Sequence, residues 1–153
     1  MRHRDRTGQV SLSPIQVNPD LWSRVDLLVI NEEEEPFALG PVEHVLAQGG
    51  IAVVTLGPAG ARVYRGQQTL WFPALKMRQI VNRNGAGDSF AAAMAIALAR
   101  GDNLEAAAAT AIVASGLSLR SHGVQGIASQ QEVLARLGNP AETGSHPSGD
   151  NSI

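Results

Sequence analysis

The sequence predicts an α/β domain organised around a parallel sheet. Residues 25–30 and 51–56 are continuous apolar runs, which are typical of strands buried on both faces. Between them, apolar residues recur at roughly helical spacing over residues 32–48, and Gly49-Gly50 ends the helix that this spacing predicts. A strand, a helix and a strand in this order indicate a βαβ unit with two parallel strands.

Further elements are expected on both sides of this unit. In chain order they are a short strand (10–15), a helical turn (20–23), a hairpin (61–64 with 69–72, turning at Gly66), a strand (77–81), two alanine-rich helices (89–99, opened by a glycine turn, and 104–119) and a short helix (130–137). We expect a charged N-terminal segment (1–9), one domain (10–137) and a disordered tail (138–153), because the tail has few apolar residues.

Composition limits the classes of function. The chain has 153 residues, 44% of them hydrophobic, and a formal charge of −2, which fits one globular domain and argues against nucleic acid as the main partner. It has no cysteine, which excludes disulfides and thiolate zinc sites and agrees with a cytoplasmic location. Its most apolar stretch, residues 89–99, is too short for a bilayer, which needs about 20 residues, so we expect no membrane partner.

The stretch Gly85-Ala86-Gly87-Asp88 is the strongest candidate for a functional site. Two glycines allow a sharp turn and close approach of a ligand, and the alanine-rich run that follows favours a helix. The N–H groups of a first helical turn have no partner inside the helix and can hold a phosphate, while Asp88 could accept a proton from an attacking hydroxyl. The alternative is a plain glycine turn, with an aspartate that the helix dipole favours.

Three features in a fixed order resemble the ribokinase-like (PfkB) carbohydrate kinase family. They are Asn31-Glu32-Glu33-Glu34 as an N-x-x-E motif, residues 55–61 as T-L-G-x-x-G-A, and residues 85–88 as the G-A-G-D signature. The resemblance extends over about residues 10–137. It implies the C-terminal half of a ribokinase-like, Rossmann-like fold with three layers, α/β/α, in which part of the parallel sheet carries a small hairpin.

The family resemblance implies ATP-dependent phosphoryl transfer to a hydroxyl of a sugar or nucleoside. Carried over position by position, Asp88 would be the general base. The N–H groups of Gly85, Ala86 and Gly87 would form the anion hole for the transferring phosphoryl. Positioning and electrostatic stabilisation are most of what a kinase must supply, so both roles agree with the chemistry.

The same resemblance assigns residues to the nucleotide. Thr55, Gly57 and Gly60 would lie along ATP, and His122 with Gly123 lies where the family's adenine pocket is usually lined. For the first three residues the alternative is an ordinary strand-to-turn connection. For His122 it is a surface histidine.

The resemblance also implies a magnesium ion. Asn31 and Glu34 would help to place Mg²⁺ through water, because this ion sheds its hydration shell reluctantly. The alternative is an acidic run, residues 32–35, at a helix start, where the dipole and solvent favour it without a metal.

The chain departs from the family in two ways. Residues 82–84 read Asn-Arg-Asn where the family usually has D-T-T, so an amide replaces a carboxylate that commonly belongs to a monovalent-cation site. Members are normally about twice as long, so the chain resembles a C-terminal half, either a fragment or one half of a split enzyme, and the expected partners are an N-terminal half or further copies of the chain. The competing hypothesis is a non-catalytic nucleotide-binding remnant.

Overall fold

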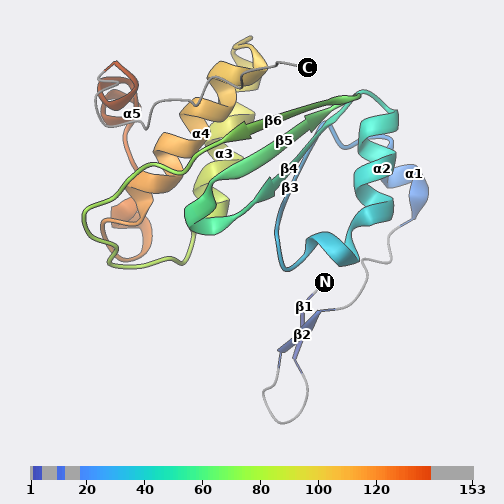
Figure 1. The fold of residues 1–153 in the computed structure, drawn as a ribbon, viewed down its shortest axis with the longest axis horizontal. Helices are drawn as coiled ribbons and strands as arrows, with labels where there is room; N and C mark the ends of the chain where they lie inside the picture. Colours follow the sequence, from blue (N-terminus) through green and yellow to red (C-terminus); the bar gives the residue numbers. More distant parts are fainter. Residues whose placement is uncertain (1, 5–9, 13–17, 139–153) are drawn as a thin grey trace, which may run out of the picture.

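The protein has three layers in a computed structural model that describes residues 2–4, 10–12 and 18–138 (Figure 1). The middle layer is a four-stranded sheet with the strand order β3-β4-β5-β6. Its strands are β3 (Leu27–Asn31), β4 (Ile51–Thr55), β5 (Ala61–Arg65) and β6 (Gln68–Phe72). Helices cover both faces of this sheet, so the predicted α/β/α architecture is confirmed.

The predicted βαβ unit is present. β3 and β4 are parallel, and α2 (Leu39–Ala47) connects them. A short helix, α1 (Pro19–Trp22), precedes β3. The helix starts later than expected, because a 3₁₀ turn at Glu35–Phe37 comes first. A helix starting at residue 32 would place Pro36 in its interior, where the ring clashes with the preceding turn and the N–H is missing.

β3 is less buried than the sequence predicts. Residues Ile51 to Val54 of β4 are all buried, whereas Ile30 is the one residue of β3 that is buried. β3 is the edge strand of the sheet, so the helices that cover β4 from both faces reach only part of it.

The predicted hairpin is confirmed and extends the sheet. β5 and β6 are antiparallel and turn at Gly66, whose φ of 58° lies in the left-handed region. β5 also pairs antiparallel with β4, so the hairpin makes a mixed sheet. A separate antiparallel ribbon joins β1 (Arg2–Arg4) to β2 (Val10–Leu12), which lies within the short strand expected at residues 10–15.

Each face of the sheet has its own hydrophobic core. On one face Val53 and Val63 pack against Phe90 and Met94 of α3 (Ala86–Ala99) and against the alanines of α4 (Leu104–Ser118). On the other face Ile30 and Val54 pack against the α2 side of the molecule. The α4 side chains at this core are mostly alanine, and α3 and α4 pack extensively against each other.

Local signals explain where the helices begin. The Asn103 side chain accepts a hydrogen bond from the Ala106 N–H and caps α4. Ser129 and Glu132 form a complete capping box at α5 (Gln130–Leu137), which confirms the predicted short helix. α3 instead follows Gly85, which has a φ of 83°.

The strand predicted over residues 77–81 is wrong. Within the described chain, residues 73–84 contain no strand and run beside α4. The Val81 and Asn82 N–H groups both donate to the Leu119 carbonyl, at 2.8 and 3.3 Å. The C-terminal end of α4 thus takes the backbone bonds that a neighbouring strand would have supplied.

Two expectations concern the ends of the chain and the membrane. The predicted tail lies outside the described residues except for Gly138, and so does most of the charged segment 1–9. Of the helices in the described ranges, none combines the length and the apolar character needed to cross a bilayer.

Candidate active site

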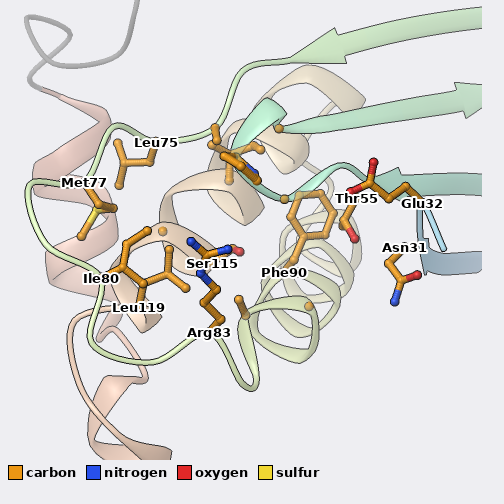
Figure 2. A pocket seen from close by; sticks show the side chains of 18 of the residues that line it. Asn31, Glu32, Thr55, Leu75, Met77, Ile80, Arg83, Phe90, Ser115 and Leu119 are labelled. Atoms are coloured by element: carbon orange, nitrogen blue, oxygen red, sulfur yellow. The ribbon is translucent and has the colours of Figure 1, made fainter. Parts of the chain in front are cut away.

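A pocket of about 610 Å³ lies between the end of the parallel strands, the glycine turn and α4 (Figure 2). Asn31 and Thr55 are the last residues of β3 and β4, so the pocket begins at the carboxyl edge of the sheet. Open α/β sheets bind ligands at this edge. The predicted residues Asn31, Thr55, Gly57, Gly60, Ala86 and Gly87 all line the pocket.

The register of the parallel strands β3 and β4 places two polar residues side by side at the edge of the pocket. Asn31 and Thr55 are register partners in the parallel pair, so their side chains lie beside each other. The Thr55 hydroxyl donates to the Ile30 carbonyl at 3.2 Å, and the Glu32 N–H donates to the Thr55 carbonyl at 3.1 Å. Two strands that are far apart in sequence therefore build one edge of the pocket.

Asn31 and Glu34 form a reciprocal cap. The Glu34 N–H donates to the Asn31 Oδ1 at 2.9 Å, and the Asn31 N–H donates to the Glu34 Oε2 at 3.1 Å. Asn31 lines the pocket together with Glu32 and Glu33, whose oxygens are of the kind that Mg²⁺ prefers, but the described residues contain no group of three acidic or histidine side chains placed to hold a metal ion. Because the cap uses Asn31 Oδ1 and Glu34 Oε2, these donors suit a hydrated ion better than one bound directly.

The loop after β4 closes tightly on itself. The Leu56 N–H donates to the Gly60 carbonyl at 2.8 Å, and Gly60 has a φ of 105°. A Cβ at Gly60 would collide with the Phe72 carbonyl oxygen. Glycine is therefore required where the loop meets the hairpin, which explains the second glycine of the T-L-G-x-x-G pattern.

The glycine turn opens α3 at the other side of the pocket. The Ser89 N–H donates to the Gly85 carbonyl at 2.9 Å, so the N–H groups of Ala86, Gly87 and Asp88 precede the first closed turn. A Cβ at Gly85 or at Gly87 would meet no atom within 4 Å, so the space in front of this turn is open. The positive end of a 14-residue helix thus faces a space where an anion fits.

Asp88 lies in the first turn of α3 and is exposed. It is not among the residues that line the pocket, although Ala86 and Gly87 directly before it are. Asp88 thus follows two lining residues directly in the chain, and its role as the general base stays a prediction.

The sequence analysis missed the apolar wall. Figure 2 shows Leu75, Met77, Ile80 and Leu119 together on the side of the pocket away from Asn31 and Thr55. Two of these four residues, Met77 and Ile80, belong to the strand that was expected over residues 77–81. The apolar residues Leu75, Met77 and Ile80 line a pocket here instead of facing a sheet core.

Gly116 shapes this wall from α4. A Cβ at Gly116 would lie 2.7 Å from the Leu75 Cβ, so the missing side chain makes room for Leu75. Ser115, next to it, also lines the pocket. The small residues at 114–116 were a signal for close packing, but the sequence did not reveal that their partner is residue 75.

The two carboxylates of the pocket lie away from the apolar wall, whereas its two cations come from the segment that carries this wall. Glu32 and Glu33 follow β3 at the sheet edge, Arg83 lies just before the glycine turn, and Lys76 lies on the segment between the hairpin and this turn. His122 and Gly123 lie in the turn region after α4, are exposed and fall outside the lining. Their assignment to the nucleotide stays a prediction.

Comparisons with known proteins support the same family as the motifs. The profile of the pfkB family carbohydrate kinases matches residues 5–131. The ribokinase of Lactococcus lactis is 34% identical over 117 residues, which are 74% of this chain and 39% of that relative.

Solved ribokinases have the same fold as this chain. The ribokinase of Thermotoga maritima superposes with a TM-score of 0.68 and 29% identity, covering 80% of this chain and 46% of that one. The ribokinase of Arabidopsis thaliana, solved with ribose and ATP, has a TM-score of 0.68 and 25% identity, covering 78% of this chain and 43% of that one. The chain spans less than half the length of each of these relatives.

Proposed function

The chain belongs to the pfkB family of carbohydrate kinases, and from this premise we propose that it supplies the nucleotide-binding and proton-accepting part of an ATP-dependent kinase for a sugar or nucleoside hydroxyl. The observation that carries the proposal is the pocket, which joins the glycine turn of α3 to the loop after β4. These are the two places where the family motifs predicted ATP.

The division of the pocket supports one orientation of the nucleotide. The adenine would lie against the apolar wall at Leu75, Met77 and Leu119, because a flat aromatic base gains most from apolar surface. The phosphates would then extend towards Gly87 and the first-turn N–H groups of α3. Arg83, on the same side, would add a positive charge near them.

Asp88 would act on the acceptor. An attacking hydroxyl must lose its proton as the new bond to phosphorus forms, and a carboxylate at the edge of the phosphate site can accept that proton. The first-turn N–H groups would meanwhile stabilise the charge on the phosphoryl oxygens. Both groups lie on one rigid helix, which keeps their separation constant.

Asn31 and Glu34, with Glu32 and Glu33 beside them, would hold a hydrated Mg²⁺ at the sheet edge. When bound, the ion would neutralise charge on the ATP phosphates. The reciprocal cap fixes the positions of the Asn31 and Glu34 side chains whether or not an ion is present.

Nucleotide binding is tested first, on the 153-residue chain with a fluorescent ATP analogue. Ser115→Leu places a larger side chain in the pocket. Because this side chain occupies space that the nucleotide needs, we expect the affinity for the ATP analogue to fall at least about tenfold. Ala106→Leu, on an exposed face of the same helix, is the matched control and should bind as the unchanged chain does. Equal affinities for both variants would remove the pocket from the proposal.

Phosphoryl transfer is tested on a chimera. The part of the Lactococcus lactis ribokinase that this chain does not cover is joined to it, and ATP consumption is measured with ribose and with a panel of nucleosides. Turnover with any acceptor supports the kinase. Nucleotide binding without turnover in the chimera favours the alternative, a non-catalytic nucleotide-binding remnant.

A further inference from the structure

A second, separate groove lies on the outer side of the segment that forms the apolar wall. It has a volume of about 760 Å³ and lies between residues 76–81, the end of α4 and α5. Its described lining residues are Lys76, Met77, Arg78, Gln79, Val81, Leu117, Arg120 and Arg136. Neither the proposed reaction nor the family motifs use this groove.

The lining of this groove carries one sign of charge. Four of its eight residues are Lys or Arg, and none is Asp or Glu. The whole chain has 12 Lys and Arg against 14 Asp and Glu, so a third of its basic residues meet in one groove of a slightly acidic protein. A groove lined by like charges raises the local concentration of ions of the opposite sign.

Two of these cations come from elements that hold them in place. The Arg120 Nε donates to the Leu117 carbonyl at 2.9 Å, and its Nη2 donates to the Glu132 Oε1 at 2.9 Å. Arg136 is half-buried on α5. Glu132 neutralises part of the Arg120 charge from outside the lining.

We propose that this groove binds a small anion carrying phosphate groups, separately from the nucleotide in the first pocket. Guanidinium groups match phosphate oxygens with paired hydrogen bonds, and three arginines are present. The volume is that of a small-molecule site, and Met77, Val81 and Leu117 add apolar surface for the organic part of a phosphate ester.

The groove and the first pocket share a wall. Lys76 and Met77 line both cavities, so an anion in the groove contacts the segment that would lie against the nucleotide. If an anion in the groove moves this shared wall, it changes the affinity of the first pocket for the nucleotide. By linkage, the nucleotide then changes the affinity of the groove for the anion by the same factor.

Met77 gives a direct probe of this wall. The chain has three methionines, and Met94 is fully buried in the core, so a methyl-labelled sample contains both a reporter and an internal control. Inorganic pyrophosphate is titrated into the 153-residue chain while the methyl NMR signals of Met77 and Met94 are followed. Sodium chloride at equal ionic strength is the salt control.

Variants identify the site. We expect pyrophosphate to shift the Met77 signal saturably and to leave Met94 unchanged, and Arg78→Gln and Arg136→Gln each to weaken binding about tenfold. Arg65→Gln, on the hairpin and outside the lining of both cavities, is the control and should bind as before. The Met94 signal reports whether each variant is folded, and Arg78 is exposed, so its replacement leaves the packing intact.

Three results would overturn the proposal. One is a Met77 signal that pyrophosphate does not move. Another is an equal shift with sodium chloride. The third is a loss of binding with Arg83→Gln in place of Arg78→Gln, which would assign the anion to the glycine turn.

Discussion

Asn31 and Glu34 each accept a hydrogen bond from the other's backbone, through Asn31 Oδ1 and Glu34 Oε2. The pair has the pattern of a capping box at the end of β3. The N-x-x-E motif is therefore a structural cap in this fold, whatever it adds to magnesium binding. The two roles make different demands on Glu34, so they can be separated.

Replacing Glu34 by Ala removes the acceptor for the Asn31 N–H and should lower the free energy of unfolding by about 1 kcal/mol. Glu34→Gln keeps a side-chain oxygen and should cost less. Denaturant unfolding of both variants measures the difference. If the carboxylate also serves Mg²⁺, Glu34→Gln should reduce the magnesium dependence of ATP binding; an unchanged dependence would leave Glu34 with the structural role alone.

Gly85 and Gly87 should respond to alanine with opposite signs. Gly85 has a φ of 83°, so Gly85→Ala should destabilise the chain by roughly 1–2 kcal/mol through backbone strain. Gly87 lies inside α3, so Gly87→Ala should stabilise the helix by roughly 0.5–1 kcal/mol. A Cβ meets nothing within 4 Å at either position, so contacts do not confuse the comparison. Thermal unfolding of both variants is the measurement, and effects of equal sign would contradict it.

Asp88→Asn removes the proton acceptor and leaves the first-turn N–H groups of α3 in place. In the chimeric enzyme, kcat should fall at least about 100-fold while nucleotide affinity stays the same or rises slightly. Asp102→Asn makes the same change at an exposed residue before α4 and should leave kcat intact. An unchanged kcat in Asp88→Asn would remove this carboxylate from the mechanism.

Periodicity and turn residues in the sequence predicted much of the fold. The buried run at 51–56, the hairpin at Gly66 and the capped α4 depend on local sequence, and the structure has all three. The three family motifs likewise predicted two sides of the pocket. These signals lie within a few residues of the features that they predict.

The errors involve partners that are distant in sequence. Residues 77–81 have strand-like composition, but in the described chain they run beside α4 and pair with no strand, and the Leu119 carbonyl accepts the Val81 N–H instead. The contact of Leu75 with Gly116 spans 41 residues, so periodicity could not indicate the apolar wall. The basic groove arises in the same way, because its arginines come from three separate segments.

Acid should destabilise the fold at α5 by protonating the Glu132 carboxylate. Hydrogen bonds from the Ser129 backbone N–H and hydroxyl, and from Arg120, lower the pKa of Glu132 from 4.5 to about 2. A lowered pKa in the folded state stabilises the fold above pH 4.5, and this contribution is lost as the pH falls from 4.5 towards 2.

Thermal unfolding of the unchanged chain and of Glu132→Gln, measured from pH 7 to pH 2, tests this. The difference in Tm between them should be largest at neutral pH and should shrink below pH 4.5. Glu105→Gln, in the first turn of α4, is the matched control for loss of a carboxylate at a helix start. A difference that is constant with pH would contradict the assignment.

The unpaired outer edge of β3 should make copies of the chain associate with one another. Within the described sheet β3 pairs with β4 alone, so its outer backbone groups are available to another strand. Sedimentation velocity of the 153-residue chain should show concentration-dependent association, and the chimera should suppress it. A monodisperse monomer that unfolds cooperatively would contradict this and would favour an independent binding module.

The segment along the apolar wall is attached to α4 at two points, Leu75 against Gly116 and the Val81 and Asn82 N–H groups on Leu119. Gly116 and Leu119 are three residues apart, which is nearly one helical turn. Both attachments therefore join the segment to the same, last turn of α4. The opposite side of the pocket, at Thr55, belongs to the sheet, so the width of the pocket depends on how α4 is placed against the sheet.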